Sequence, residues 1–174
     1  MEIKTWELDR RKEELRFQYE EDLSHLVKEV DELRKISPVK VAGVAYETGG
    51  FYTVKGHLQS KAVLQCSRCL APFDYHIEVD FTEIFIPERI ETNLDQENEN
   101  VHRLTSDEID LTSLVEEIVL LEIPYAPVCQ EECKGLCPVC GTNLNELQCN
   151  CDKTRIDPRL ADLAKWFDQN KDSK

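Results

Sequence analysis

The sequence predicts an α+β fold: an antiparallel β-meander packed with helices, followed by a C-terminal cysteine-rich segment of the zinc-ribbon type. Three observations carry this prediction. Apolar and polar residues alternate over much of residues 39–86, shorter stretches place apolar residues at helical spacing, and five of the eight cysteines lie within residues 133–151. We place the α+β domain at residues 1–128 and the metal-binding segment, with a final helix, at residues 129–174.

The first 38 residues predict strands and then a helix. Apolar side chains at Ile3, Trp6 and Leu8, and again at Leu15, Phe17 and Tyr19, are separated by charged or polar residues, as in strands. The spacing then becomes helical, at Leu23, Leu26, Val27, Val30 and Leu33. Ser37-Pro38 ends this helix, because proline disfavours helical geometry in the residue before it.

Residues 39–86 predict the meander. The segments "VKVAGVAY", "FYTVKGHL" and "KAVLQC" read as strands, and Glu47-Thr48-Gly49-Gly50 is a turn signal between the first two. Alternation resumes after "CSRCLAPF" and continues to Phe85. The first cysteine pair therefore falls in the connection between two strands.

Residues 87–110 are polar, acidic and poor in large apolar side chains, so we expect a mobile loop, which is either a solvated linker or an acidic arm for a basic partner. Apolar residues at helical spacing then mark a helix from Leu111 to Leu121, with Asp110 and Thr112 as candidate caps and Pro124 beyond its end. Asp157-Pro158 predicts the start of a last helix.

The charge balance limits the choice of partners. Lys and Arg number 21 against 35 Asp and Glu, which gives a net charge of -14. Phosphate binding needs clustered Lys and Arg, so a basic protein partner fits better than direct, charge-driven binding of nucleic acid.

The sequence shows neither a membrane-spanning segment nor an export signal, and the expected location in the cell rests on these two points. The longest apolar run, "IVLLEIPYAPVC", is interrupted by Glu122 and two prolines and is too short to span a bilayer. The N-terminus shows no basic and then apolar export signal, so we expect a cytoplasmic protein that contacts no membrane. Thiols stay reduced in the cytoplasm, which favours metal ligands over disulfides.

The cysteines form four pairs, and two sets of four ligands would fill two closed tetrahedral zinc sites. Proximity in sequence groups the last two pairs into one ribbon-like site and the first two pairs into another, which would attach the C-terminal region to the meander. The Cys-x-Cys pair can serve one metal only if its residues turn, because alternate side chains of a strand point to opposite faces. The proposed ligands are Cys66, Cys69, Cys129, Cys133, Cys137, Cys140, Cys149 and Cys151.

Rival cysteine chemistries fit less well than structural zinc. The spacing of Cys133, Cys137 and Cys140 matches radical enzymes with an iron–sulfur cluster, but such enzymes need a much larger barrel. A redox pair at Cys66 and Cys69 would need a helix after its first cysteine, where a strand is expected. An ordinary iron–sulfur protein stays open as the main alternative, because thiolates serve both metals.

Four motifs, "CSRCLAPF", "IDLTSLVEEIVLLEIPYAPVC", "CKGLCPVCGTNLN" and "DPRLADL", resemble the YceD family of large ribosomal RNA subunit accumulation proteins. The resemblance covers roughly residues 58–165. It implies a bacterial cytosolic protein needed for normal accumulation of 23S ribosomal RNA, and it supplies neither the metal nor the mechanism.

Two classes of function follow. The first is a non-enzymatic assembly factor that binds a basic ribosomal protein, a large-subunit assembly intermediate or a 23S rRNA precursor. The second is a metal-dependent nuclease or other enzyme of precursor rRNA processing, whose catalytic zinc would need an open position and, as a rule, His or carboxylate ligands. The histidines are scattered along the chain, so we predict no catalytic residues.

Overall fold

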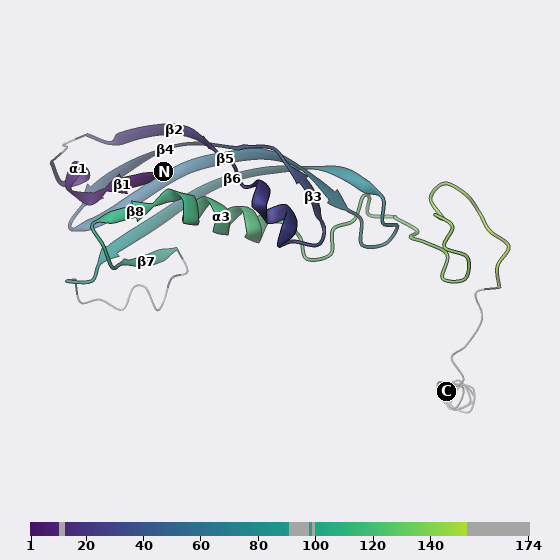
Figure 1. The fold of residues 1–174 in the computed structure, drawn as a ribbon. Helices are drawn as coiled ribbons and strands as arrows, with labels where there is room; N and C mark the ends of the chain where they lie inside the picture. The colour runs from purple at the N-terminus through teal and green to yellow at the C-terminus, as the bar shows by residue number, and fades with distance from the viewer. Residues whose placement is uncertain (11–12, 91–97, 99, 153–174) are drawn as a thin grey trace, which may run out of the picture. The chain divides into compact units, whose positions relative to one another are not determined.

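A curved β-sheet forms most of the first part of the protein in the computed structural model, which describes residues 1–10, 13–90, 98 and 100–152 (Figure 1). The described chain divides into two compact units. The first unit comprises Met1–Ser67 and Ala71–Cys129, and the second joins Arg68–Leu70 to the residues from Gln130 onward.

Five strands of the sheet follow the order β2-β4-β5-β6-β7, and β3 lies off this path. Antiparallel pairing joins β2 to β4, β4 to β5, and β5 to β6, whereas β7 is parallel to β6. Strand β3 pairs with the far end of β5, beyond the end of β4. The bounds are β2 (Leu15–Glu21), β3 (Leu33–Ile36), β4 (Val39–Thr48), β5 (Phe51–Gln65), β6 (Pro72–Pro87) and β7 (Val101–Leu104).

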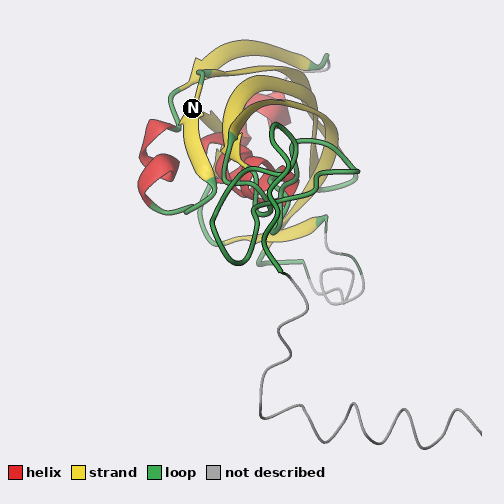
Figure 2. Ribbon diagram, turned by 90° about the vertical axis from the view of Figure 1, so that its right-hand side faces the viewer, coloured by secondary structure: helices red, strands yellow, loops and turns green. Residues whose placement is uncertain are grey.

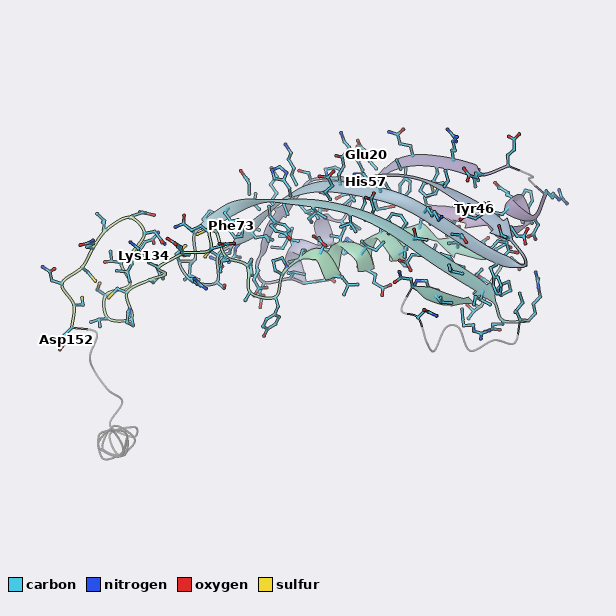
Figure 3. The ribbon with its side chains drawn as sticks, turned by 180° about the vertical axis from the view of Figure 1, so that it is seen from behind. Glu20, Tyr46, His57, Phe73, Lys134 and Asp152 are labelled. Atoms are coloured by element: carbon cyan, nitrogen blue, oxygen red, sulfur yellow. The ribbon has the colours of Figure 1, made fainter. Side chains whose placement is uncertain are left out.

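The sheet curves round helix α3 (Leu111–Glu122), as the view in Figure 2 shows. Alternation along the strands turns one face inward, where Val41, Val54 and Leu58 are buried in one core with the helix residues Val115 and Val119. The other face is polar. Figure 3 shows Glu20 and His57 on that side of the sheet, away from α3.

Two glycines let the sheet bend closely round its core. Phe17, Gly43, Gly56 and Phe81 lie opposite one another in a row across β2, β4, β5 and β6. A Cβ atom at Gly56 would lie 2.5 Å from the Phe81 ring, and one at Gly43 would lie 2.7 Å from the Phe17 ring. The two phenyl rings therefore occupy the space that side chains at the two glycines would fill.

Hydrogen bonds hold both ends of α3: Asp110 caps its N-terminal end, and a side chain of the sheet bonds to its C-terminal end. Asp110 accepts a hydrogen bond from the Thr112 N–H at 2.9 Å and one from the Ser113 hydroxyl at 2.7 Å. At the other end the Tyr75 hydroxyl of β6 donates to the Glu122 carbonyl at 3.2 Å. These bonds satisfy groups that a helix leaves without partners at its termini. The predicted helix from Leu111 and its Asp110 cap are confirmed.

A small second sheet pairs β1 (Glu2–Lys4) with β8 (Glu108–Asp110), and the short helix α1 (Thr5–Arg10) follows β1. Ile3 and Ile109 face each other in this pair and are both buried. No helix in the described ranges is both long and apolar enough to cross a membrane.

The expected strand through Trp6 and Leu8 is wrong, because residues from Thr5 onward form α1. Thr5 and Leu8 are its buried residues, whereas Trp6 is 49% exposed. Burial three residues apart is helical spacing.

The expected helix over Leu23–Leu33 is also wrong. A short 3₁₀ helix, η1 (Ser24–Lys28), takes its place, and β3 begins at Leu33. The edge of β5 beyond β4 offers backbone groups that need partners, and β3 supplies them with Leu33 opposite Leu64. Strand pairing therefore overrides the helical spacing.

The expected acidic loop over 87–110 is only partly a loop. Residues 101–104 and 108–110 form β7 and β8, because Val101 and Leu104 pair with β6 and Ile109 enters the core. Residues 91–97 and 99, and the final helix expected from Asp157, lie outside the described residues. The part of the chain that the structure describes is thus mostly β-sheet with few helices and with cysteine clusters toward its C-terminal end.

Candidate metal centres

The structure brings the cysteines together in two groups of four, each of which could hold a metal ion. Within each group the sulfur atoms all lie within 4.8 Å of one another. These are the same two sets that proximity in sequence predicts. We call them the first quartet (Cys66, Cys69, Cys129 and Cys133) and the second quartet (Cys137, Cys140, Cys149 and Cys151).

The turn from Cys137 to Gly141 directs backbone N–H groups at a cysteine sulfur, which is the arrangement of a metal-binding turn. The backbone N–H groups of Cys140 and Val139 donate hydrogen bonds to Cys137 and lower the pKa of its thiol. Gly141, at φ 75°, then reverses the chain so that the Cys137 N–H reaches the Thr142 carbonyl at 2.8 Å. Such N–H groups stabilise thiolates, which are the form that binds metal.

The turn from Cys66 to Leu70 repeats this backbone course between β5 and β6. The Cys66 N–H donates to the Ala71 carbonyl at 2.9 Å, which is the same offset of five residues. Leu70, at φ 59°, stands where the other turn has glycine, and it is the one residue other than glycine with positive φ among the described residues. Both Cys-x-x-Cys turns thus have the form of metal-binding turns.

A pair of hydrogen bonds holds the segment that leads to Cys129 beside the start of the turn from Cys66 to Leu70. Ser67 donates from its N–H and from its hydroxyl to the Pro127 carbonyl, each at 2.8 Å. Cys66 is fully buried, and Cys129 is half-buried. Cysteines that are 63 residues apart in sequence can therefore serve the same ion.

The Cys-x-Cys pair reaches the second quartet because it does not lie in a strand. Residues 147–151 have no regular secondary structure, so Cys149 and Cys151 are freed from the opposite directions that a strand would impose. Hydrogen bonding by Thr142, whose hydroxyl lies 3.2 Å from Cys140 Sγ, lowers the pKa of Cys140 to about 6. Hydrogen bonding to Cys140 raises the pKa of Cys151 to about 12. Neighbouring thiols therefore titrate together, one with a lowered and one with a raised pKa, and a metal ion that binds them releases the remaining protons.

Sequence reasoning missed two side chains that support the cysteines from within the second unit. The Arg68 guanidinium donates to the carbonyls of Glu131 and Cys133, each at 3.1 Å. The Asn145 amide donates to Cys133 Sγ at 3.4 Å, and its Oδ1 accepts from the Lys134 N–H at 2.8 Å. The one sequence feature that could have predicted the role of Asn145 is the segment "GTNLN" after Cys140, because Asn side chains commonly bond to nearby backbone.

The donor set fits zinc in a structural role. Four thiolates complete a tetrahedral shell and leave no open position, whereas a catalytic zinc keeps one for water or substrate. Iron–sulfur clusters also use four cysteines, so the donor set leaves the metal open between the two. The quartets differ in exposure: Cys66, Cys69 and Cys133 are buried, whereas Cys140 is exposed.

The described histidines stand apart from the quartets, and three of them face carboxylates. His57 Nδ1 lies 2.8 Å from Asp80 Oδ1, a partner on the neighbouring strand that spacing along the chain does not predict. His102 Nε2 lies 2.7 Å from Glu83 Oε2. Within the described ranges, the two quartets are the groups of His, Cys, Asp or Glu whose ligand atoms converge.

Comparisons with known proteins find one matching family and several similar proteins. The family model described as "Large ribosomal RNA subunit accumulation protein YceD" matches residues 54–166. An uncharacterized protein of Bacillus subtilis, YlbN, is 34% identical over 164 residues, which cover 90% of this chain and 91% of that protein. An uncharacterized protein of Mycobacterium tuberculosis, Rv2926c, is 34% identical over 120 residues, 69% of this chain and 58% of that protein.

A plant protein carries the family name. The chloroplastic "Large ribosomal RNA subunit accumulation protein YCED homolog 1" of Arabidopsis thaliana is 36% identical over 62 residues. The matched region covers 36% of this chain and 19% of the plant protein, so it is a small part of that relative. No solved structure matches the chain significantly.

Proposed function

The chain belongs to the YceD family of large ribosomal RNA subunit accumulation proteins, and from this premise we propose that it is a non-enzymatic, cytoplasmic factor in ribosome biogenesis. In this role it supports accumulation of 23S rRNA and assembly of the large subunit. The family name of the matched model is the single observation that carries the proposal.

The quartets have a structural role in this proposal, with one zinc ion in each. Zinc would supply a fixed tetrahedral cross-link between segments that are distant in sequence. The chain's own contribution is to hold the sulfurs ready: the N–H groups of Val139 and Cys140 favour the thiolate of Cys137, and Asn145 orients Cys133. An all-cysteine shell supports a non-enzymatic role, because it leaves no position for a substrate.

The proposed partner is a basic ribosomal protein or an rRNA-containing assembly intermediate. The net charge of -14 supports a basic protein, since attraction between opposite charges speeds association and selects the partner.

Metal content tests the structural part of this proposal. We predict about two zinc ions per chain, because eight thiolates fill two tetrahedral shells. Elemental analysis of protein purified without added metal measures this number, and Cys140→Ser should reduce it to about one. Iron with acid-labile sulfide, or protein that is metal-free and disulfide-bonded, would show that the zinc assignment is wrong.

Two further experiments test the cellular role. Deleting the gene in its host should lower the ratio of 23S to 16S rRNA, and the parent gene on a plasmid should restore it. Affinity purification at graded salt, with RNA and protein both identified, should recover a large-subunit protein or intermediate. A normal ratio in the deletion strain would overturn the proposal, and cleavage of precursor rRNA by the purified protein would replace it with the nuclease alternative.

A further inference from the structure

The C-terminal end of α3 and the residues just after it carry large, exposed apolar side chains. Leu120, Leu121 and Tyr125 are 38%, 79% and 97% exposed, although they lie within six residues of one another. The opposite side of the same helix is buried in the core through Leu114 and Val119. Neighbouring exposed apolar side chains of this size are typical of binding surfaces.

Acidic residues border these apolar side chains on the preceding turn of the helix. Glu116 and Glu117, with Ser113, Leu120 and Leu121, line an open cavity of about 490 Å³. Glu116 Oε1 lies 3.2 Å from His25 Nε2 of η1, and Glu117 has no ion-pair partner among the described residues. The surface thus combines apolar area with at least one free negative charge.

This charge selects the class of occupant. Nucleic acid would place its phosphates against the two carboxylates, and a second copy of a chain with net charge -14 would bring like charges together. A basic protein segment instead pairs its cations with the carboxylates and its apolar side chains with the leucines. Amphipathic helices bind apolar grooves in this way, through side chains spaced three or four residues apart.

We propose that this α3 surface (Ser113, Glu116, Glu117, Leu120 and Leu121), with Tyr125 shortly beyond the helix in sequence, binds a basic amphipathic helix of a partner protein. The identity of that partner as a ribosomal protein rests on the proposed function. The surface itself rests on exposure, cavity and charge.

The test uses the full-length, zinc-loaded protein and a fluorescent peptide of Leu and Lys, about five helical turns long, with all leucines on one face. Fluorescence anisotropy should show binding to the parent, and Leu121→Ser should raise the Kd about tenfold. Glu117→Gln should raise the Kd at low salt and leave it unchanged at high salt, where screening already removes the attraction. Leu147→Ser is the matched control, because Leu147 is 66% exposed in the second unit, and its Kd should equal that of the parent.

A scrambled peptide of the same composition, without an apolar face, should bind more weakly than the amphipathic one. Equal binding of both peptides, no binding by the parent, or an unchanged Kd for Leu121→Ser would overturn the proposal. Sedimentation that shows a dimer in the parent and a monomer in Leu121→Ser would overturn it too, in favour of a second copy as occupant. The peptide experiments test only whether the α3 surface binds an amphipathic helix. The 23S to 16S rRNA ratio in the deletion strain tests the proposed function, so the two proposals can fail separately.

Discussion

Asp110 sets the start of α3 with one carboxylate that serves two donors, the Thr112 N–H and the Ser113 hydroxyl. Asp110→Ala removes both bonds, and we expect a loss of about 1 kcal/mol in the free energy of unfolding. Urea denaturation measures this loss. Asp110→Asn is the control, since it keeps an acceptor oxygen and should lose less.

The same carboxylate predicts a dependence on pH. The Ser113 hydroxyl lowers the pKa of Asp110 in the folded protein below its ordinary value. A lowered folded pKa means that the carboxylate stabilises the fold above about pH 4 and stops doing so as the pH falls through the folded pKa. The difference in unfolding free energy between the parent and Asp110→Asn should therefore shrink in acid. A difference that is constant from neutral pH to pH about 3 would contradict this role.

In the two Cys-x-x-Cys turns, Leu70 is the residue whose backbone conformation is unfavourable for a residue with a side chain. Its φ of 59° is a conformation that favours glycine, and Gly141 occupies the matching place in the other turn at 75°. We expect Leu70→Gly to stabilise the protein by about 1 kcal/mol or less, because relief of strain exceeds the added flexibility of glycine in the unfolded chain. Thermal unfolding of the metal-loaded protein measures the gain.

Gly141→Ala is the reverse substitution. A Cβ atom there would meet no atom within 4 Å, so any loss of stability reflects backbone conformation alone. Stability that falls in Leu70→Gly would show that the Leu70 side chain matters more than its φ.

At the scale of elements, the row of Phe17, Gly43, Gly56 and Phe81 decides how closely four strands pack round the core. Gly56→Ala would place a Cβ atom 2.5 Å from the Phe81 ring, which must then move. We expect a loss of about 1–3 kcal/mol in unfolding free energy. Ala42→Ser, on the exposed face of β4 beside this row, should change little.

A double-mutant cycle separates the clash from a general preference for glycine. Phe81→Leu costs stability in the parent, but it should cost less in Gly56→Ala, because the smaller side chain leaves room for the new methyl group. Additive losses would mean that the ring and the glycine do not interact.

The elements show where sequence patterns suffice. Period-two alternation predicted β4 and β6, and helical spacing with an Asp cap predicted α3, because each pattern matches the face that its element buries. The two strands expected at "FYTVKGHL" and "KAVLQC" are instead one continuous strand, β5, because its pairing with β6 continues through Gln59 and Ser60. The pattern from Leu23 to Leu33 failed for the opposite reason: its apolar side chains are buried as expected, but the need of β5 for an edge partner decides their backbone. Local spacing carries no information about a distant strand edge.

At the scale of the whole molecule, the chain carries a net charge of -14, and exposed charges govern association with a partner more than they govern the fold. Changing Glu91, Asp95, Glu97 and Glu99 to Gln or Asn removes four charges from a polar segment outside the described residues. We expect unchanged thermal stability and weaker binding to a basic ribosomal protein, most clearly at low salt. Equal binding at every salt concentration would identify the segment as a solvated linker.

The grouping of the cysteines was predictable from the sequence, whereas the side chains that support them were not. Proximity in sequence, with the reducing compartment expected for the chain, predicted two sets of four cysteines, and the sulfur positions form the same two sets. The contributions of Arg68 and Asn145 depend on which backbone groups come near them after folding. Metal binding by the quartets stays a prediction that elemental analysis will decide.

The pairing of β1 with β8 has a consequence for the order of folding. β4, β5 and β6 join neighbours in sequence through short connections, so little chain entropy is lost when they meet. Ile3 must instead find Ile109, across almost the whole first unit. During synthesis the N-terminal strand waits until residue 110 has left the ribosome, while the hairpins behind it already form. The nascent chain therefore exposes Ile3 and Leu8 until late, and the β1–β8 pair joins the core among the last elements, together with α3.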